Sequence, residues 1–219
     1  MKIIAVAMQK GGVGKSNLTR SLAVAAAQSG LNVLALDMDS QQSTSQWGER
    51  REAELPAVQF VTEIDLPKMV ARAQEANADL IIIDTPPARS SEAPAAVEAA
   101  DLVLIPCTAD IEAFEQLPRT VRLARTTGTP AAAVLTLATP NSKSEEDAAR
   151  GVFDAVGVPM VPGIIHRFKV HRDASREGKS AQELEPNSKA ANEIAVIWQW
   201  VCAELQIGTS ARVHNKARK

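Results

Sequence analysis

The sequence predicts an α/β fold, a doubly wound and mainly parallel sheet with helices on both of its faces. Short apolar runs alternate along the chain with longer segments of helical periodicity, which is the order that builds strand–helix–strand units. Two of the runs, LIIID and LVLIP, are apolar at nearly every position, as parallel strands are when helices cover both sides. We therefore expect a sheet buried in the middle of the molecule.

Seven short apolar runs are the expected strands. Their lengths are typical of strands in globular proteins. In chain order they occupy residues 3–7, 32–36, 58–62, 80–83, 102–106, 132–137 and 160–165.

Helical patterns fill the intervals between these runs. The first expected helix begins at Lys15 and continues to about Ser29, where Gly30 ends it. Asn187 or Ser188 can cap the last expected helix, because both side chains accept hydrogen bonds from a first helical turn. That helix repeats apolar residues at helical spacing, at Ile194, Ile197, Val201 and Leu205. The other expected helices cover residues 65–76, 91–99, 111–126 and 144–156.

The composition is that of a globular protein with one core. The chain has 219 residues, 45% of them hydrophobic, and a net charge of −2, so any basic surface must be local. We expect one domain over residues 1–207 and a disordered basic tail over 208–219. Two cysteines, Cys107 and Cys202, are too few for a zinc or disulfide framework and are expected to be reduced and buried in a cytoplasmic protein. No run is long enough to cross a membrane, and the N-terminus does not read as a signal peptide.

Residues 9–16, QKGGVGKS, follow the first expected strand and enter the first expected helix. They match the phosphate-loop pattern at Gly14, Lys15 and Ser16, although Gln9 replaces its first glycine. Glycines let backbone N–H groups turn inward on an anion, and the helix start adds further N–H groups and a positive dipole end. Lys15 would neutralise β- and γ-phosphate charge, and Ser16 would offer its hydroxyl to Mg²⁺. The expected nucleotide-binding set is Lys10, Gly11, Gly12, Val13, Gly14, Lys15, Ser16 and Asn17.

Lys10 is a second lysine in this loop. It lies on the entry side, so it cannot easily fold back over its own glycines, and we expect it to reach outward. In a face-to-face dimer it would enter the other subunit's site and contact the phosphates there. The alternative is a solvated surface lysine.

Carboxylates follow two of the other expected strands. Asp37 and Asp39 end the segment NVLALDMD, and Asp84 ends DLIIID. Open α/β sheets bind ligands at the carboxyl ends of their strands. Asp39 is expected to position or deprotonate a water for attack on the γ-phosphate, and Asp37 to support either Mg²⁺ or the loop. Asp84 has the arrangement that holds Mg²⁺ directly or through water in phosphate-loop ATPases.

Together, KGGVGKS, LDMDSQ and LIIIDTPP resemble the motifs of the ParA/MinD family of deviant Walker A ATPases, and the resemblance extends from Met1 to about Leu205. It implies an ATPase that uses ATP and Mg²⁺, with Lys10 crossing to the partner's ATP, Lys15 on its own phosphates and Asp39 beside the hydrolytic water. The chain is most similar to small plasmid and chromosome partition ParA proteins. These form ATP-bound dimers on non-specific double-stranded DNA, and a cargo-bound, ParB-like partner stimulates their slow hydrolysis. Ser40 and Asn17 depart from the family's usual residues.

Non-specific DNA binding needs several basic side chains on one face. The resemblance favours Arg167, Lys169 and Arg172, with Lys189 at the start of the last helix, and implies association with the nucleoid. A second basic cluster, Arg119, Arg122 and Arg125, recurs every three residues on one expected helix. Solvated helix faces are the alternative for both clusters.

Two other functions stay open, and a third is disfavoured. The same switch can position another cargo, such as a carboxysome, a chemoreceptor array or a DNA-transfer complex. A ligase similar to dethiobiotin synthetase uses the same scaffold, but a lysine that crosses a dimer argues against it. Membrane cycling is disfavoured, because the C-terminal segment ARVHNKARK has one substantial apolar residue, Val213.

Overall fold

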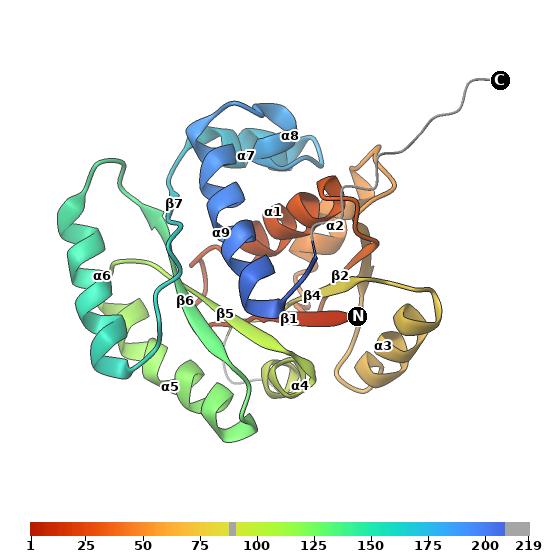
Figure 1. Cartoon of the computed structure of the whole chain (residues 1–219), viewed down its shortest axis with the longest axis horizontal. Helices are drawn as coiled ribbons and strands as arrows, with labels where there is room; N and C mark the ends of the chain where they lie inside the picture. The colour runs from red at the N-terminus through yellow and green to blue at the C-terminus, as the bar shows by residue number, and fades with distance from the viewer. Residues whose placement is uncertain (88–90, 209–219) are drawn as a thin grey trace.

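A computed structural model describes residues 1–87 and 91–208 of the chain. The expected tail, 208–219, therefore lies outside the described residues except for Gly208. Within the described residues, seven strands form a single sheet in the order β3-β2-β4-β1-β5-β6-β7 (Figure 1). The neighbouring strands of this sheet all pair in parallel, which confirms the expected fold class. The strands are β1 (Lys2–Val6), β2 (Val33–Asp37), β3 (Ala57–Phe60), β4 (Leu80–Asp84), β5 (Leu102–Cys107), β6 (Ala131–Ala138) and β7 (Ile165–His166).

The last strand is the one substantial error in the expected strands. Residues 160–165 were expected to form it, but β7 is only Ile165–His166, and Met160 makes an isolated bridge to Ala133. The intervening Pro162 has no N–H to donate to a ladder. Gly163 packs so closely on the last helix that a Cβ there would lie 2.4 Å from Cγ1 of Ile197.

Helices cover both faces of the sheet. Their bounds are α1 (Lys15–Gln28), α2 (Ser43–Glu49), α3 (Leu66–Glu75), α4 (Glu92–Ala99), α5 (Ile111–Thr127), α6 (Lys143–Val156), α7 (Lys169–Arg176), α8 (Ala181–Leu184) and α9 (Lys189–Leu205). Figure 1 shows α3 to α6 on one side of the sheet and α1 and α9 on the other. Successive strand residues alternate between the two sides, so that Ile3 joins the core under α3 to α6 and Ile4 joins the core under α1 and α9.

The expected helices are present within a few residues of their predicted ends. Ser188, one of the two expected caps, accepts a hydrogen bond from the Ala191 N–H at the start of α9. The sequence did not indicate α2, α7 or α8. These helices are short and polar, and α7 buries only Val170 and Ala174, so few apolar positions mark them in the sequence.

Two composition-based predictions can be checked in the described part of the chain. Cys107 and Cys202 are both free and buried, as expected. Among the described helices, none combines the length and the apolar character that a membrane crossing requires.

Candidate functional site

The pairing of the central strands brings the predicted site residues together. Asp84 is the register partner of Val6 in β1 and of Asp37 in β2. The loop that follows β1 and the carboxylates that end β2 and β4 therefore meet at one edge of the sheet. β1 lies between β4 and β5, where the strand order changes direction, and such a switch point is where open α/β sheets bind ligands.

The loop has the backbone that its glycines predict. Gly12 and Gly14 have φ angles of +77° and +90°, which other residues rarely adopt. Gly14 precedes the first turn of α1, and that turn has no acidic residue and no side-chain cap. Its N–H groups are therefore available to an anion. The Oγ1 of Thr136 in β6 donates to the Val13 carbonyl (2.7 Å) and fixes the middle of the loop.

A cavity of about 410 Å³ opens above this loop, within the usual range for small-molecule sites. Most of the predicted nucleotide set lines it, together with Asp39. The predicted members that line it are Gly11, Gly12, Gly14, Lys15, Ser16 and Asn17. Lys10 and Val13 do not line it, and Val13 is buried beneath the loop. The cavity is also lined by five residues that the sequence did not predict, namely Arg20, Gln41, Ser43, Pro87 and Leu137.

Lys15 is nearly buried, with 6% of its surface exposed. Its Nζ donates to the Lys10 carbonyl (3.2 Å). Burial lowers the pKa of this ammonium, while Asp84 and Asp39 act in the opposite direction. A largely desolvated cation at the base of a cavity provides a fixed counter-charge for an anionic ligand.

Asp84 is also buried, and burial raises the pKa of its carboxyl to about 6. The Oγ1 of Thr44 donates to its Oδ2 (2.6 Å), and the nearby Ser16 hydroxyl also favours the charged form. Its Oδ1 is buried and has no hydrogen-bond partner. An unpartnered carboxylate oxygen beside a serine hydroxyl fits Mg²⁺, which prefers oxygen ligands.

Asp37 is arranged differently. Its Oδ1 accepts from the Asp39 N–H (3.0 Å), and its Oδ2 accepts from the N–H groups of Thr44 (2.9 Å) and Ser45 (2.8 Å). The carboxylate therefore holds the loop after β2 and the start of α2. Of its two expected roles, this geometry corresponds to support of the loop, and metal binding by Asp37 stays a prediction.

Asp39 lies at the rim of the cavity, in the loop held by Asp37. Its Oδ1 accepts from the Gln41 N–H (2.9 Å), and the side chain is partly exposed. It is thus accessible from the cavity and locally fixed.

Lys10 points away from its own loop. Its Nζ lies 3.9 Å from Oδ1 of Asp110 and 3.7 Å from Oε2 of Glu112, at the start of α5. A third of the Lys10 side chain remains exposed. These long contacts with exposed acids are weak, so the lysine can leave them at little cost.

Arg20, on the second turn of α1, is a site residue that sequence reasoning missed. Its Nε donates to the Ser16 carbonyl (2.9 Å), and its Nη1 donates to Oγ of Ser175 in α7 (3.1 Å). An arginine inside a helix pattern carries no signal of such a bridge, because Ser175 lies 155 residues further along the chain.

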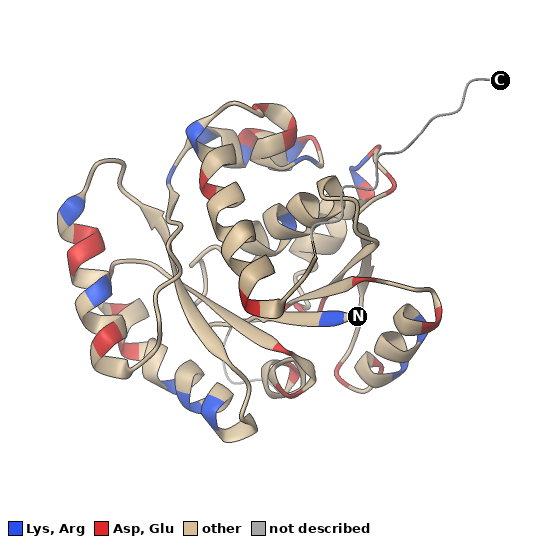
Figure 2. Cartoon of the chain, viewed as in Figure 1, with Lys and Arg blue, Asp and Glu red and all other residues tan. Residues whose placement is uncertain are grey.

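The candidate DNA-binding residues lie near one another around α7. The side chains of Arg167, Lys169 and Arg172 are exposed. Helix α8 packs on both α7 and α9, and Lys189 is exposed at the start of α9. Asp173 pairs with Lys169 (3.2 Å) and with Arg176 (3.7 Å). Figure 2 shows this mixture of basic and acidic positions on α7. In the second cluster, Arg125 donates to the carbonyls that end α6, a structural role.

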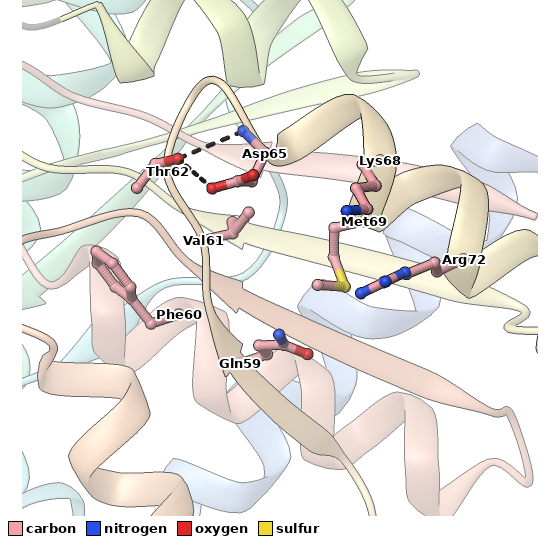
Figure 3. A pocket seen from close by; sticks show the side chains of 8 residues that line it. All are labelled: Gln59, Phe60, Val61, Thr62, Asp65, Lys68, Met69 and Arg72. Carbon is pink, nitrogen blue, oxygen red and sulfur yellow. Dashed lines mark hydrogen bonds between the residues drawn. The ribbon is translucent and has the colours of Figure 1, made fainter.

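Another cavity, of about 320 Å³, lies at the edge strand β3 (Figure 3). Gln59 in β3 and Met69 and Arg72 in α3 point into it. None of the predicted site residues lines it, so we place the candidate site at the loop cavity.

Known proteins are similar to this chain in sequence and in fold. A family model described as the CobQ/CobB/MinD/ParA nucleotide binding domain matches residues 4–188. The chain is similar to the maintenance of carboxysome distribution protein A of Gloeobacter kilaueensis, with 33% identity over 207 residues, covering 93% of this chain and 94% of that protein. It is also similar to protein ParA of Rhizobium radiobacter, with 32% identity over 108 residues and 48% of each chain.

Solved structures share the fold at lower identity. The septum site-determining protein MinD of Pyrococcus horikoshii, solved with Mg-ADP, superposes with a TM-score of 0.81 at 19% identity, over 96% of this chain and 99% of that one. A variant of Cyanothece McdA, solved in complex with ATP, superposes with a TM-score of 0.75 at 20% identity, over 95% and 97% of the two chains.

Proposed function

Because the chain belongs to the CobQ/CobB/MinD/ParA family of nucleotide-binding proteins, we propose that it is an ATP-driven positioning switch. In this proposal the ATP-bound form is a homodimer that binds double-stranded DNA without sequence preference. Hydrolysis, stimulated by a ParB-like partner protein on the cargo, returns the protein to a form that leaves the DNA. The chain would then be associated with the nucleoid.

The observation that carries the proposal is the opposite placement of two lysines from one loop. Lys15 lies inside the cavity and is nearly buried, whereas Lys10 is held outside it by weak contacts. Lys15 can supply positive charge to the phosphates within its own subunit. A second lysine, directed away from that site, can contact phosphates in a facing subunit. Such a contact would make dimerisation sensitive to the γ-phosphate.

The residues of the cavity support ATP hydrolysis. The loop N–H groups and Lys15 would hold the β- and γ-phosphates, and Asp39 would orient the attacking water. Ser16 and Asp84 would hold Mg²⁺, which offsets negative charge on the phosphate oxygens. Asp37 would keep Asp39 in place through the Asp39 N–H.

The cargo is proposed from the relatives. Similarity over nearly the whole length to a carboxysome distribution protein favours a protein compartment such as a carboxysome. A plasmid or chromosome is the second candidate, because the chain is also similar to a ParA protein over about half its length.

DNA binding at several salt concentrations, with Mg-ATP, with Mg-ADP and without nucleotide, tests the proposal. We expect strong binding only with ATP, with an affinity that falls steeply as salt rises, because basic side chains displace counterions from the phosphates. Lys15→Ala should remove ATP binding, and with it the ATP-dependent part of DNA binding. Equal binding in all three nucleotide states would reject the switch and leave a ligase or another ATPase as the better explanation.

A further inference from the structure

Arg20 belongs to two regions of the molecule at once. It lines the nucleotide cavity, and its Nε holds the Ser16 carbonyl in the first turn of α1. The other side of its guanidinium reaches Ser175 in α7, the helix that carries the candidate DNA-binding residues. A planar guanidinium donates in several fixed directions, so one arginine can hold both ends, which a lysine cannot.

A second path joins the same two regions through α2. The guanidinium carbons of Arg20 and Arg51 lie 5.9 and 4.5 Å from the centre of the Trp47 ring, within cation–π range. Trp47 is completely buried, and its indole N–H donates to the Lys179 carbonyl (2.9 Å) just after α7.

Arg51 continues this path into α8. Its side chain is 3% exposed and makes paired hydrogen bonds to Glu183 at 3.0 and 2.8 Å. Glu183 also accepts from the Ser180 N–H (2.8 Å), which fixes the start of α8. We call Arg20, Trp47, Arg51 and Glu183 the arginine–tryptophan stack.

The first turn of α2 is also hydrogen-bonded to the carboxylates of the site. Thr44, in its first turn, donates from its hydroxyl to Asp84 and from its N–H to Asp37. A displacement of the Asp39 loop or of Asp84 must therefore move α2 or break these bonds. Because the stack connects α2 to α7 and α8 through buried contacts, such a movement reaches the basic surface.

From these contacts we propose that Arg20 is a positioning residue that couples nucleotide occupancy to the placement of α7. The proposal rests on the proposed function for its purpose, since it explains how ATP could control a DNA-binding surface. The contacts on which it depends lie within one subunit and do not include DNA. Arg20 responds to a phosphate-bearing ligand near Ser16, and Ser175 and the arginine–tryptophan stack carry the response to α7 and α8.

Hydrogen–deuterium exchange of the full chain, with and without Mg-ATPγS, tests the coupling without DNA. In the wild type we expect slower amide exchange in α7 when the nucleotide binds. Ser175→Ala removes only the far end of the bridge, and Arg20→Lys keeps the charge but cannot hold both ends. Both variants should reduce the response in α7, and Ser175→Ala, which lies outside the cavity, should keep the response in the phosphate loop. Arg150→Lys, on α6, is the control and should behave as the wild type.

The functional readout is the ratio of DNA affinities measured with ATP and with ADP. We expect Ser175→Ala to reduce this ratio about tenfold, a typical coupling magnitude, while ATP affinity stays near the wild-type value. An unchanged exchange response of α7 in Ser175→Ala, or no response of α7 in the wild type, would overturn the coupling. If Arg20→Lys does not fold, Ser175→Ala decides the question. Absence of ATP-dependent DNA binding in the wild type would reject the proposed function, and the exchange experiment would still test the coupling.

Discussion

Replacing Asp84 with asparagine should make the nucleotide-free protein more stable at neutral pH. Burial raises the pKa of the Asp84 carboxyl from its ordinary value of 3.8 to about 6. In the unfolded chain the group loses its proton near pH 3.8, whereas the folded protein retains that proton until about pH 6. The folded state therefore binds more protons within this window, and its stability falls as the pH rises through it.

The magnitude follows from the two pKa values. They differ by about two pH units. Each unit corresponds to about 1.36 kcal/mol, so the ionised carboxylate lowers the free energy of unfolding by about 3 kcal/mol at pH 7 and above. Asparagine has the same shape without the charge. We expect Asp84→Asn to gain about 2 to 3 kcal/mol at pH 7.5, or roughly 5 to 10 °C in Tm, and almost nothing at pH 4.

Urea unfolding at pH 4 and pH 7.5, in EDTA, measures this gain. Asp37→Asn is the matched control, because Asp37 is equally buried beside Asp84 but accepts three backbone N–H groups. Its replacement leaves at least one N–H without an acceptor and should lose about 1 to 3 kcal/mol. The reasoning is refuted if Asp84→Asn is no more stable than the wild type at pH 7.5, or gains equally at both pH values. The same variant should also weaken the dependence of ATP binding on Mg²⁺.

Five other substitutions test the structure. Gly178→Ala should lose about 3 kcal/mol or more in thermal unfolding, because φ is +66° and a Cβ would lie 2.5 to 2.7 Å from backbone atoms of residues 50 and 51. Gly128→Ala has a similar φ of +73° and no atom within 4 Å, so it should lose only about 1 to 2 kcal/mol. Lys10→Ala should keep ATP binding but lose the ATP-dependent dimer; an unaltered dimer in light scattering would contradict a contact across subunits. Asp39→Ala should still form that dimer but release phosphate at least tenfold more slowly, and normal turnover would remove Asp39 from the mechanism. Asp173→Asn frees Lys169 and Arg176 from their shared acid, so it should tighten DNA binding and steepen its salt dependence, whereas weaker binding would place the DNA surface elsewhere.

The parts of the site that the sequence predicted are those built from contiguous residues. The glycines lie in the loop after β1, Lys15 and Ser16 begin the helix that follows it, and parallel strands bring Asp37 and Asp84 to the same edge of the sheet. The roles of the two carboxylates could not be separated in advance. The distinction depends on Thr44, whose hydroxyl bonds one carboxylate and whose N–H bonds the other.

The features that sequence reasoning missed depend on tertiary contacts. Helices α2 and α7 are short and mostly polar, so few apolar positions mark them in the sequence. Hydrogen bonds from the buried side chains of Trp47 and Arg51 to distant residues fix this region. The seventh strand begins later than the apolar run 160–165 predicts, because Pro162 and Gly163 interrupt that run. Arg20 carried no sequence signal, since its partners come from distant parts of the chain.

The position of β1 also determines when this protein can fold during its synthesis. β1 leaves the ribosome before the other strands of this sheet, but its neighbours in the sheet are β4, at residues 80–84, and β5, at residues 102–107. At about 5 to 20 residues per second, translation needs roughly 5 to 20 s to add the intervening chain. Until then the apolar segment IIAVAM has no sheet partner and is open to chaperones, and the loop that follows it lacks the strands that shape it. The nucleotide cavity is therefore completed only after β4 and β5 have been made.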